Sequence, residues 1–324
     1  MMAALHTLHP DPKAVDWSRV TSAVYRVRHH YRYTYSGPVH DLRQRLMMVP
    51  ARRHGDQRLL SDNLEVRGTT GRLEVAWEED TFGNRVCLVQ AERVERAIDF
   101  EATYSVRRGD APGAALARRR DRGSATCDVS LKLTREQLAG YLAFTSLTAP
   151  DERLRSAAEA IRARASTPLE QAELAHDWAA SAINYKIGVT GVQTPAAMAL
   201  YLGAGVCQDY AHIQLAIMRS LGIPCRYVSG HLLGEGAPHA WVEALVPDSQ
   251  APEGISVAAY DPTHHRRAGR GYINVAIGRD FADVTMTSGS FSGAASGKLS
   301  YTKKAEIMEI TEREDGRAGE EAAA

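Results

Sequence analysis

The sequence predicts an α+β protein with a β-rich first part and a mixed second part. Three observations lead to this prediction. Between residues 21 and 110 apolar and polar residues alternate, and turn signals interrupt the alternation. From residue 151 the apolar residues recur at helical spacing, and from residue 225 strand-like runs follow. A group of helices followed by a group of strands is typical of an α+β domain.

The first part is expected to form a β-sandwich or barrel. VYRVRHHYRYTY, which starts at Val24, is rich in valine and tyrosine and predicts a long strand. Three further strands are predicted at RLEVAWEED (72–80), RVCLVQAERV (85–94) and DFEATYSVRR (99–108). Glycine-containing turns separate these strands, which is typical of an all-β domain.

The second part is expected to begin with helices. They are predicted at residues 151–165, from 167 onward, at 194–202 and from about 206 to 221. Pro168 suits the first position of the second helix, and Gly222 is a suitable left-handed stop after the last one. Strands are then predicted at residues 225–233, 239–246 and 255–263.

These patterns divide the chain into four parts. They are a flexible arm (1–20), a β-rich domain (21–126), a core (127–300) and a C-terminal segment with a disordered tail (301–324). At the end of the β-rich domain, residues 109–126 are polar and rich in glycine and alanine, as expected of a linker.

Composition excludes several classes of function. Lys+Arg and Asp+Glu number 39 each, so no basic excess indicates a nucleic-acid partner. No apolar run reaches the roughly 20 residues that span a bilayer, and no secretory signal is evident, so we expect a cytoplasmic protein without a membrane partner. The four cysteines form no CxxC pair, and we expect them to be reduced.

GAGVCQDYAHI, residues 203–213, is the first candidate site. Gly203 and Gly205 allow a sharp turn, and helical periodicity begins directly after them. Cys207 therefore lies in the first turn of a helix, close to unpaired backbone N–H groups. An ordinary cysteine is only about 3% thiolate at pH 7, and a helix N-terminus or a neighbouring histidine lowers the thiol pKa. Those N–H groups could also hold an oxyanion.

Two further residues could complete such a site. His239 begins the strand HAWVEALV after a Gly/Pro loop, and Asp261 ends the strand ISVAAYD just before Pro262. If these strands are neighbours, the two side chains meet at the rim of the sheet. Asp261 could then hold one ring nitrogen of His239 while the other faces Cys207. Thiol, imidazole and carboxylate in that order form the triad of cysteine acyl transferases and proteases.

A lone cysteine is more often a buried core residue, and this is how we interpret Cys87 and Cys225. Cys127 has no informative context. For Cys207, the glycine turn, the helix start and the two matched partners together favour a nucleophile.

The ordered motifs GVCQDYAH, HAWVE and YDPT closely resemble those of the bacterial transglutaminase-like superfamily, which is related in fold to papain-type cysteine proteases. The resemblance covers roughly residues 165–265. It implies a nucleophile at Cys207, a general base at His239 and an orienting carboxylate at Asp261. YRVRHHYRYTYSGPVHDLRQRLMMVP and DTFGN resemble the β-rich domain that often precedes this core in bacterial members. Arg279 and Asp280 resemble a structural pair of the family.

Neighbouring polar residues are given structural roles. Asp209 is expected to cap the helix, His212 to hydrogen-bond within the core, and Trp241 and Glu243 to be structural. Related enzymes use a side chain upstream of the cysteine as second oxyanion donor, and Tyr185 and Trp178 are the candidates by position.

No metal or cofactor is expected. Adjacent histidines at 29–30 and 264–265 would point to opposite faces of a strand, which prevents chelation. HExxH, a phosphate-binding loop and a calcium loop are absent from the sequence.

The expected function is a cysteine-dependent acyl transfer or hydrolysis on a protein or peptide amide, through a thioester. The triad does not choose between an amine and water as acceptor, so a transglutaminase-like enzyme and a protease or amidase stay open. A non-catalytic scaffold, or a binding role led by the β-rich domain, is the competing class.

Overall fold

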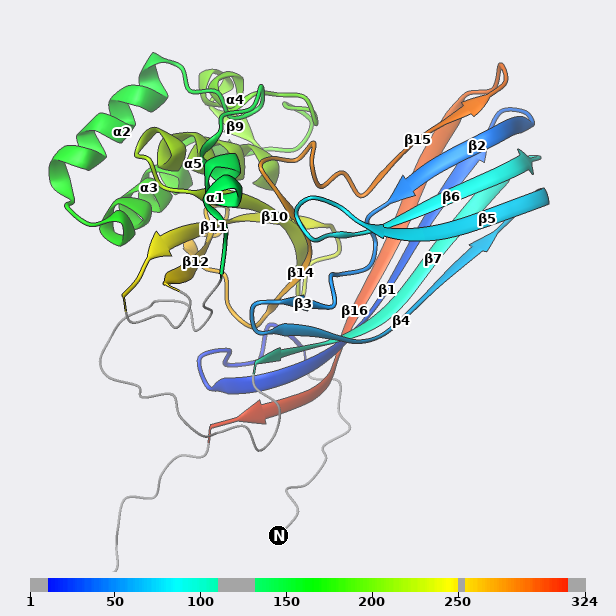
Figure 1. Cartoon of the computed structure of the whole chain (residues 1–324), viewed down its shortest axis with the longest axis horizontal. Coiled ribbons are helices and arrows are strands. Elements are labelled where there is room, and N and C mark those ends of the chain that lie inside the picture. The colour runs from blue at the N-terminus through cyan, green and yellow to red at the C-terminus, as the bar shows by residue number, and fades with distance from the viewer. Residues whose placement is uncertain (1–10, 110–131, 250–253, 314–324) are drawn as a thin grey trace, which may run out of the picture.

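The computed structural model describes residues 11–109, 132–249 and 254–313. The linker expected at 109–126 and Cys127 fall almost wholly outside these ranges. The fold is α+β, as predicted, with a two-sheet sandwich beside a helix-covered sheet (Figure 1). No helix among the described residues is both long and apolar enough to span a membrane.

The sandwich consists of a five-stranded and a four-stranded antiparallel sheet. The first has the order β16-β1-β7-β4-β3 and the second the order β15-β2-β6-β5. Their bounds are β1 (Val20–Tyr35), β2 (Val39–Leu46), β3 (Arg53–His54), β4 (Gln57–Arg67), β5 (Thr70–Glu79), β6 (Arg85–Val94), β7 (Ala97–Gly109), β15 (Thr287–Ser292) and β16 (Gly297–Glu312). Alternate residues of β1, β2, β6 and β7 are buried between the sheets, which is the pattern expected of strands covered on one face.

The last two strands depart from the expected division of the chain. Residues 287–312 had been assigned to the core and to a C-terminal segment, but β15 pairs with β2, and β16 pairs with β1 along almost its whole length. The physical reason lies in the partner: Ile307 is opposite Tyr25 and is buried in the sandwich. A strand rich in Lys and Glu is stabilised here by a pairing that is remote in sequence.

The second unit is a sheet of order β13-β12-β11-β10-β14 with helices packed against it. Its strands are β10 (Cys225–Leu232), β11 (His239–Pro247), β12 (Ile255–Asp261), β13 (Arg266–Arg267) and β14 (Tyr272–Gly278). The helices are α1 (Arg135–Leu142), α2 (Glu152–Arg164), α3 (Pro168–Ala182), α4 (Ala196–Leu202) and α5 (Cys207–Ser220), and a short parallel pair joins β8 (Asn184–Tyr185) to β9 (Ala204–Gly205). The predicted helices and the strands β10, β11 and β12 are confirmed within a residue or two.

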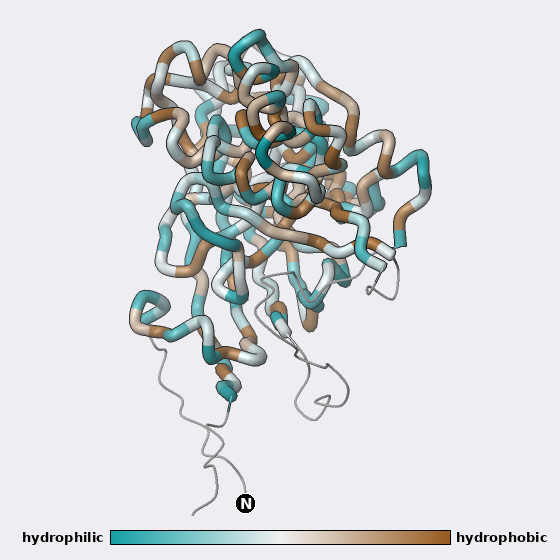
Figure 2. The backbone as a smooth tube through the Cα atoms, turned by 90° about the vertical axis from the view of Figure 1, so that its left-hand side faces the viewer, coloured by the Kyte–Doolittle hydropathy of each residue, from teal (hydrophilic) through white to brown (hydrophobic). Residues whose placement is uncertain are grey.

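Helix α5 is the centre of this unit. It packs on β10 and β11 and is surrounded by α2, α3 and α4. Every residue from Gln208 to Arg219 is buried. Figure 2 shows hydrophobic stretches gathered in this part of the molecule. A helix buried on all sides has little freedom to shift, so its first residue is held in a fixed position.

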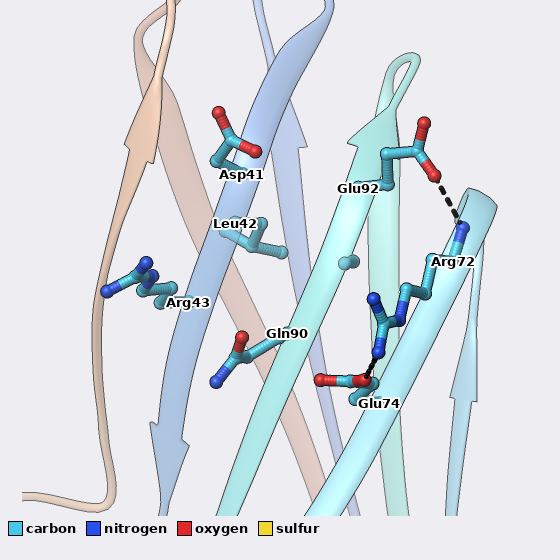
Figure 3. Close-up of a pocket in the computed structure, with 8 residues that line it drawn as sticks. Asp41, Leu42, Arg43, Arg72, Glu74, Gln90 and Glu92 are labelled. Carbon is cyan, nitrogen blue, oxygen red and sulfur yellow. Dashed lines mark hydrogen bonds and ion pairs between the residues drawn. The ribbon is translucent and has the colours of Figure 1, made fainter.

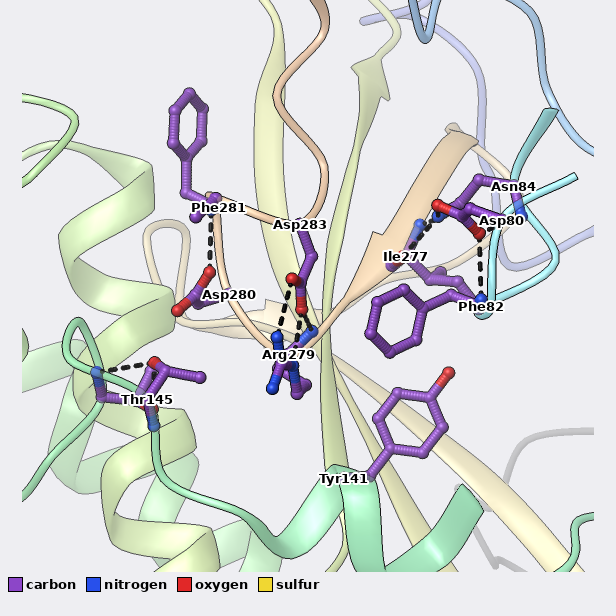
Figure 4. Close-up of polar contacts among 12 residues, drawn as sticks. Asp80, Phe82, Asn84, Tyr141, Thr145, Ile277, Arg279, Asp280, Phe281 and Asp283 are labelled. Atoms are coloured by element: carbon purple, nitrogen blue, oxygen red, sulfur yellow. Dashed lines mark hydrogen bonds and ion pairs between the residues drawn. The ribbon is translucent and has the colours of Figure 1, made fainter. Parts of the chain in front are cut away.

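Two amide side chains of the sandwich seal the outer edge of the core sheet. Asn84 donates to the carbonyl of Ile277 (2.7 Å) and accepts from its N–H (2.8 Å). Gln57 does the same with Asn274, at 2.7 and 2.9 Å. Figure 4 shows Asn84 against Ile277, with Asp80 beneath it accepting from the turn. Both amides therefore take the place of a missing strand along β14, and they fix the sandwich to the core.

Candidate active site

The N-terminus of α5 is built by its glycines and by Asp209. Gly203 ends α4 in the left-handed conformation, with φ of 63°. Gly205 has no room for a side chain, because an added Cβ would lie 2.5 Å from the Asp209 carboxylate. That carboxylate accepts from the N–H of Val206 (2.7 Å) and from the hydroxyl of Thr190 (2.6 Å). Asp209 is thus the helix cap expected from the sequence, and it places Cys207 at the first helical position.

His239 and Asp261 meet at the rim of the sheet, as the strand arrangement predicted. β11 and β12 are antiparallel neighbours, with Val242 opposite Tyr260. His239 Nε2 lies 2.8 Å from Asp261 Oδ2, and both side chains are almost fully buried. Cys207 lies close enough to the ring for its thiol to contribute to the raised pKa of His239. The structure therefore brings the three predicted site residues together.

Asp261 also holds two residues that the sequence reasoning missed. His264 Nδ1 lies 2.7 Å from Oδ2, and the hydroxyl of Tyr272 donates to the same oxygen at 2.6 Å. The other oxygen, Oδ1, accepts from the backbone N–H of Thr263 (3.0 Å) and of His264 (3.3 Å). Burial alone would raise the pKa of Asp261, but the hydrogen bonds from His239 and His264 hold it well below its usual range.

The charge of His239 is set by these contacts. Burial alone would lower the pKa of the imidazole. Hydrogen bonding to Asp261 and Cys207, together with the electrostatic influence of both groups, raises the pKa of His239 to about 10. The ring is consequently an imidazolium at neutral pH, which is the counter-ion that a thiolate requires. Trp241 stacks on it with ring centroids 6.4 Å apart.

Glu235 is a second acidic group at the site that sequence reasoning missed. It lies in the loop before β11, with Oε1 3.0 Å from His264 Nε2 and Oε2 3.9 Å from His239 Nδ1. His264 is therefore held between two carboxylates, Asp261 and Glu235. No local pattern distinguishes Glu235 from other loop acids, because its role depends on the turn that brings His264 opposite it.

The two candidate oxyanion donors lie in different places. Burial and the electrostatic influence of Cys207 and Glu235 raise the pKa of Tyr185, so this residue lies near both groups. Trp178 packs against the helical core instead. In the segment that follows Tyr185, the apolar side chains of Ile187 and Val192 are exposed. The side-chain amide of Gln208 donates to the Val192 carbonyl at 3.2 Å.

The remaining polar residues are structural. His212 is buried and accepts from the N–H of Phe281 at 3.2 Å. Glu243 forms a buried ion pair with Arg226 (2.6 Å). Burial alone would raise the pKa of Glu243, but the interactions with Arg226 and His54 hold it well below its usual range. The Arg279–Asp280 pair is not formed as expected. Arg279 pairs with Asp283 at 2.8 Å, because both residues flank the same tight turn (Figure 4).

Among the described residues, two groups of side chains have donor atoms close enough for a metal ion. They are His239, Asp261 and His264 in the site, and His176, Asp177 and His265 on its flank. His264 and His265 thus belong to separate groups, as adjacent residues pointing apart. In the first group the donor atoms already form hydrogen bonds with one another. A metal ion there would replace the hydrogen bond between His239 and Asp261.

A cysteine at a helix N-terminus, facing an imidazolium held by a buried carboxylate, is the arrangement of cysteine-dependent enzymes. The family model of the transglutaminase-like superfamily matches residues 155–251, and that of the bacterial transglutaminase-like N-terminal region matches residues 25–107. The chain thus contains a transglutaminase-like core region, preceded by a bacterial transglutaminase-like N-terminal region.

Two mycobacterial proteins are similar in sequence, and one solved structure is similar in fold. An uncharacterized protein of Mycobacterium leprae is 38% identical over 144 residues, which are 41% of this chain and 47% of that protein. One of Mycobacterium tuberculosis is 34% identical over 116 residues, 32% of this chain and 36% of the relative. The chain thus spans less than half the length of these relatives. The solved structure of "a Putative Cysteine Protease from Cytophaga hutchinsonii" shares the fold, with a TM-score of 0.66, 20% identity and coverage of 89% of this chain and 91% of that one.

Proposed function

We propose that the protein transfers an acyl group from a protein or peptide amide to an acceptor, through a thioester on Cys207. One observation supports this most strongly: His239 is held between Asp261 and Cys207 in an environment that favours its protonated form. A buried histidine without a reactive partner has a lowered pKa instead, as burial gives for His212, at about 3.

Each residue has a defined step in this reaction. The Cys207 thiolate attacks the amide carbonyl carbon, and the oxyanion is held by the N–H groups at the start of α5 and by the Tyr185 hydroxyl. The His239 imidazolium gives its proton to the leaving amine as the C–N bond breaks. Neutral His239 then takes a proton from the incoming acceptor, which attacks the thioester and releases the thiolate. Asp261 orients the ring and stabilises its charged form throughout.

The substrate class follows from the surface beside the thiol. Tyr185, Ile187 and Val192, which lie in β8 and in the segment between β8 and α4, are exposed apolar side chains. Such a surface suits a polypeptide segment with apolar side chains better than a small polar amide. A primary amine as acceptor gives transglutamination, and water gives protease or amidase activity.

A protein substrate incubated with and without a fluorescent primary amine tests the proposal. Mass spectrometry then separates three products: amine-labelled glutamine, deamidated glutamine, and newly formed chain ends. We expect at least one of them with the wild type and none with Cys207→Ala, while Cys225→Ala keeps the wild-type product because that thiol is a core group. Equal products from the wild type and Cys207→Ala would contradict the proposal.

The competing role is that of a binding scaffold. It predicts that deleting residues 1–110 abolishes a cellular phenotype, while Cys207→Ala leaves it intact. We favour the enzyme because a scaffold has no need for a charged imidazole held against a thiol.

A further inference from the structure

Strand β5 has an unpaired outer edge, and its inner face, which points toward the other sheet of the sandwich, is only partly covered. It is the last strand of its sheet, and no strand among the described residues pairs with its outer edge. In Figure 1 it lies at the side of the sandwich that extends away from the helices. A free edge with apolar side chains is a template for pairing with another strand.

The cross-strand partners show which face of β5 is the inner one. On β6 the partners Ala91, Val89 and Cys87 are 2%, 0% and 1% exposed. Opposite them on β5, and on the same face, Leu73, Val75 and Trp77 are 38%, 44% and 40% exposed. Leu60 on β4, the strand that precedes β5 in the chain, is 45% exposed. Leu73, Val75 and Trp77 are therefore apolar inner-face residues that stay partly exposed, and the Arg85 guanidinium lies 4.5 Å from the centre of the Trp77 ring.

The outer face of β5 is polar and charged. Arg72 and Glu74 lie there beside Gln90 and Glu92 of β6, and with β2 they line a shallow trough of about 330 Å³ (Figure 3). Arg72 is ion-paired with Glu74, and its backbone N–H donates to Glu92 at 2.9 Å. From Arg72 to Glu78 the strand thus carries apolar residues at odd positions and polar or small residues at even positions.

We propose that β5 pairs with β5 of a second copy of this chain, antiparallel about a two-fold axis at Val75. In this register Arg72 lies opposite Glu78 of the second copy, and the symmetry forms that pair twice. Leu73 lies opposite Trp77 of the second copy, also twice, and Val75 lies opposite itself. Opposite charges then meet on the outer face, and apolar residues meet on the inner face.

Charge complementarity selects this register among its neighbours. With the axis at Ala76, Glu74 would lie opposite Glu78, and with the axis at Glu74 that residue would lie opposite itself. If the axis lay between two residues, each apolar inner-face residue of one copy would lie opposite an outer-face residue of the other copy. The self-complementary segment RLEVAWE (72–78) therefore argues for a second copy rather than for an unrelated strand. The resulting contact is isologous, as expected of a closed dimer.

In Figure 1, β5 and α5 lie in different parts of the molecule, so the proposed contact does not involve the helix that carries Cys207. The dimer also removes an exposed apolar edge that would otherwise favour aggregation. The proposal is independent of the chemistry proposed for Cys207.

Sedimentation velocity and light scattering of the full chain over a concentration series test the proposal. We expect a concentration-dependent dimer in the wild type. Arg72→Glu and Glu78→Arg should each weaken dimerisation by about tenfold or more, because each change creates two like-charge pairs. The double variant Arg72→Glu/Glu78→Arg restores both pairs with the charges exchanged, and should return the dissociation constant to within about threefold of the wild type.

Arg43→Glu is the matched control. It makes the same charge change on the same sheet face, but on β2, and should leave dimerisation unchanged. Circular dichroism shows that each variant is folded. A wild type that stays monomeric overturns the proposal. So does a dimer that is insensitive to Arg72→Glu, or single-variant losses that the double variant does not restore.

Discussion

A single carboxylate, that of Asp261, organises the candidate site. Its Oδ2 atom is shared by His239, His264 and Tyr272, all within 2.8 Å. The sequence motif predicted only the first of these contacts. His264 and Tyr272 reach the carboxylate through the turn after β12 and through β14, and neither arrangement follows from local spacing.

The raised pKa of His239 makes stability depend on pH. Its folded value of about 10 lies above the unfolded value of about 6.5, so the folded state binds the extra proton between those limits. The stabilisation is complete below about pH 6.5 and is lost as the pH rises through about 10. We expect the difference in unfolding free energy between wild type and His239→Gln to fall across this window, as measured by urea unfolding. A difference that is flat or rises would contradict the assignment.

At the scale of the elements, the sequence predicted what local patterns determine. Helices α2, α3 and α5 carry their own caps. Asp151 and Thr167 each accept from a backbone N–H in the first turn of their helix, and Asp209 accepts from the N–H of Val206, the residue before α5. The strands that escaped prediction, β14 and β16 among them, owe their position to distant partners. β14 depends on Gln57 and Asn84, and β16 on β1. Long-range pairing of this kind leaves no mark in a short window of sequence.

The amide contacts on β14 should contribute measurably to stability. Gln57→Ala or Asn84→Ala leaves one backbone N–H and one carbonyl of β14 without a partner in a buried place. We expect each change to lower the unfolding free energy by about 1–3 kcal/mol. Gln90→Ala, an exposed amide on β6, is the control and should have little effect. Chemical denaturation measures all three, and equal small effects would show that the junction is not held in this way.

At the scale of the whole molecule, the first and the last of the described strands, β1 and β16, pair with each other. The β-rich first third is completed by residues 287–312, so the core is inserted between parts of one sandwich. The core cluster of the sandwich also includes Leu233 and Ile273 from the core sheet. The two units are consequently a single packed body at their junction, which the linear division of the sequence did not suggest.

Removal of the C-terminal strands tests this arrangement. A chain ending at Met286 lacks β15 and β16, exposes the edge of β1 and uncovers Tyr25 and Tyr31, which are buried. We expect it to be insoluble or to lose cooperative unfolding, whereas a chain ending at Arg313 keeps both strands and should unfold as the full chain does. Thermal unfolding and solubility are the measurements. A stable, cooperative chain ending at Met286 would show that the sandwich does not need these strands.

The central claim is that Cys207 is an activated thiol paired with His239. Alkylation by iodoacetamide, followed from pH 5 to 9 by mass spectrometry of the Cys207 peptide, tests it most directly. Burial raises the pKa of Cys225 to about 11 and that of Cys87 to about 12, so their peptides report background reactivity in the same digest. We expect rapid reaction at pH 6 in the wild type, and reaction only above about pH 8 in His239→Ala. Slow reaction with an ordinary thiol profile in both proteins would contradict the claim.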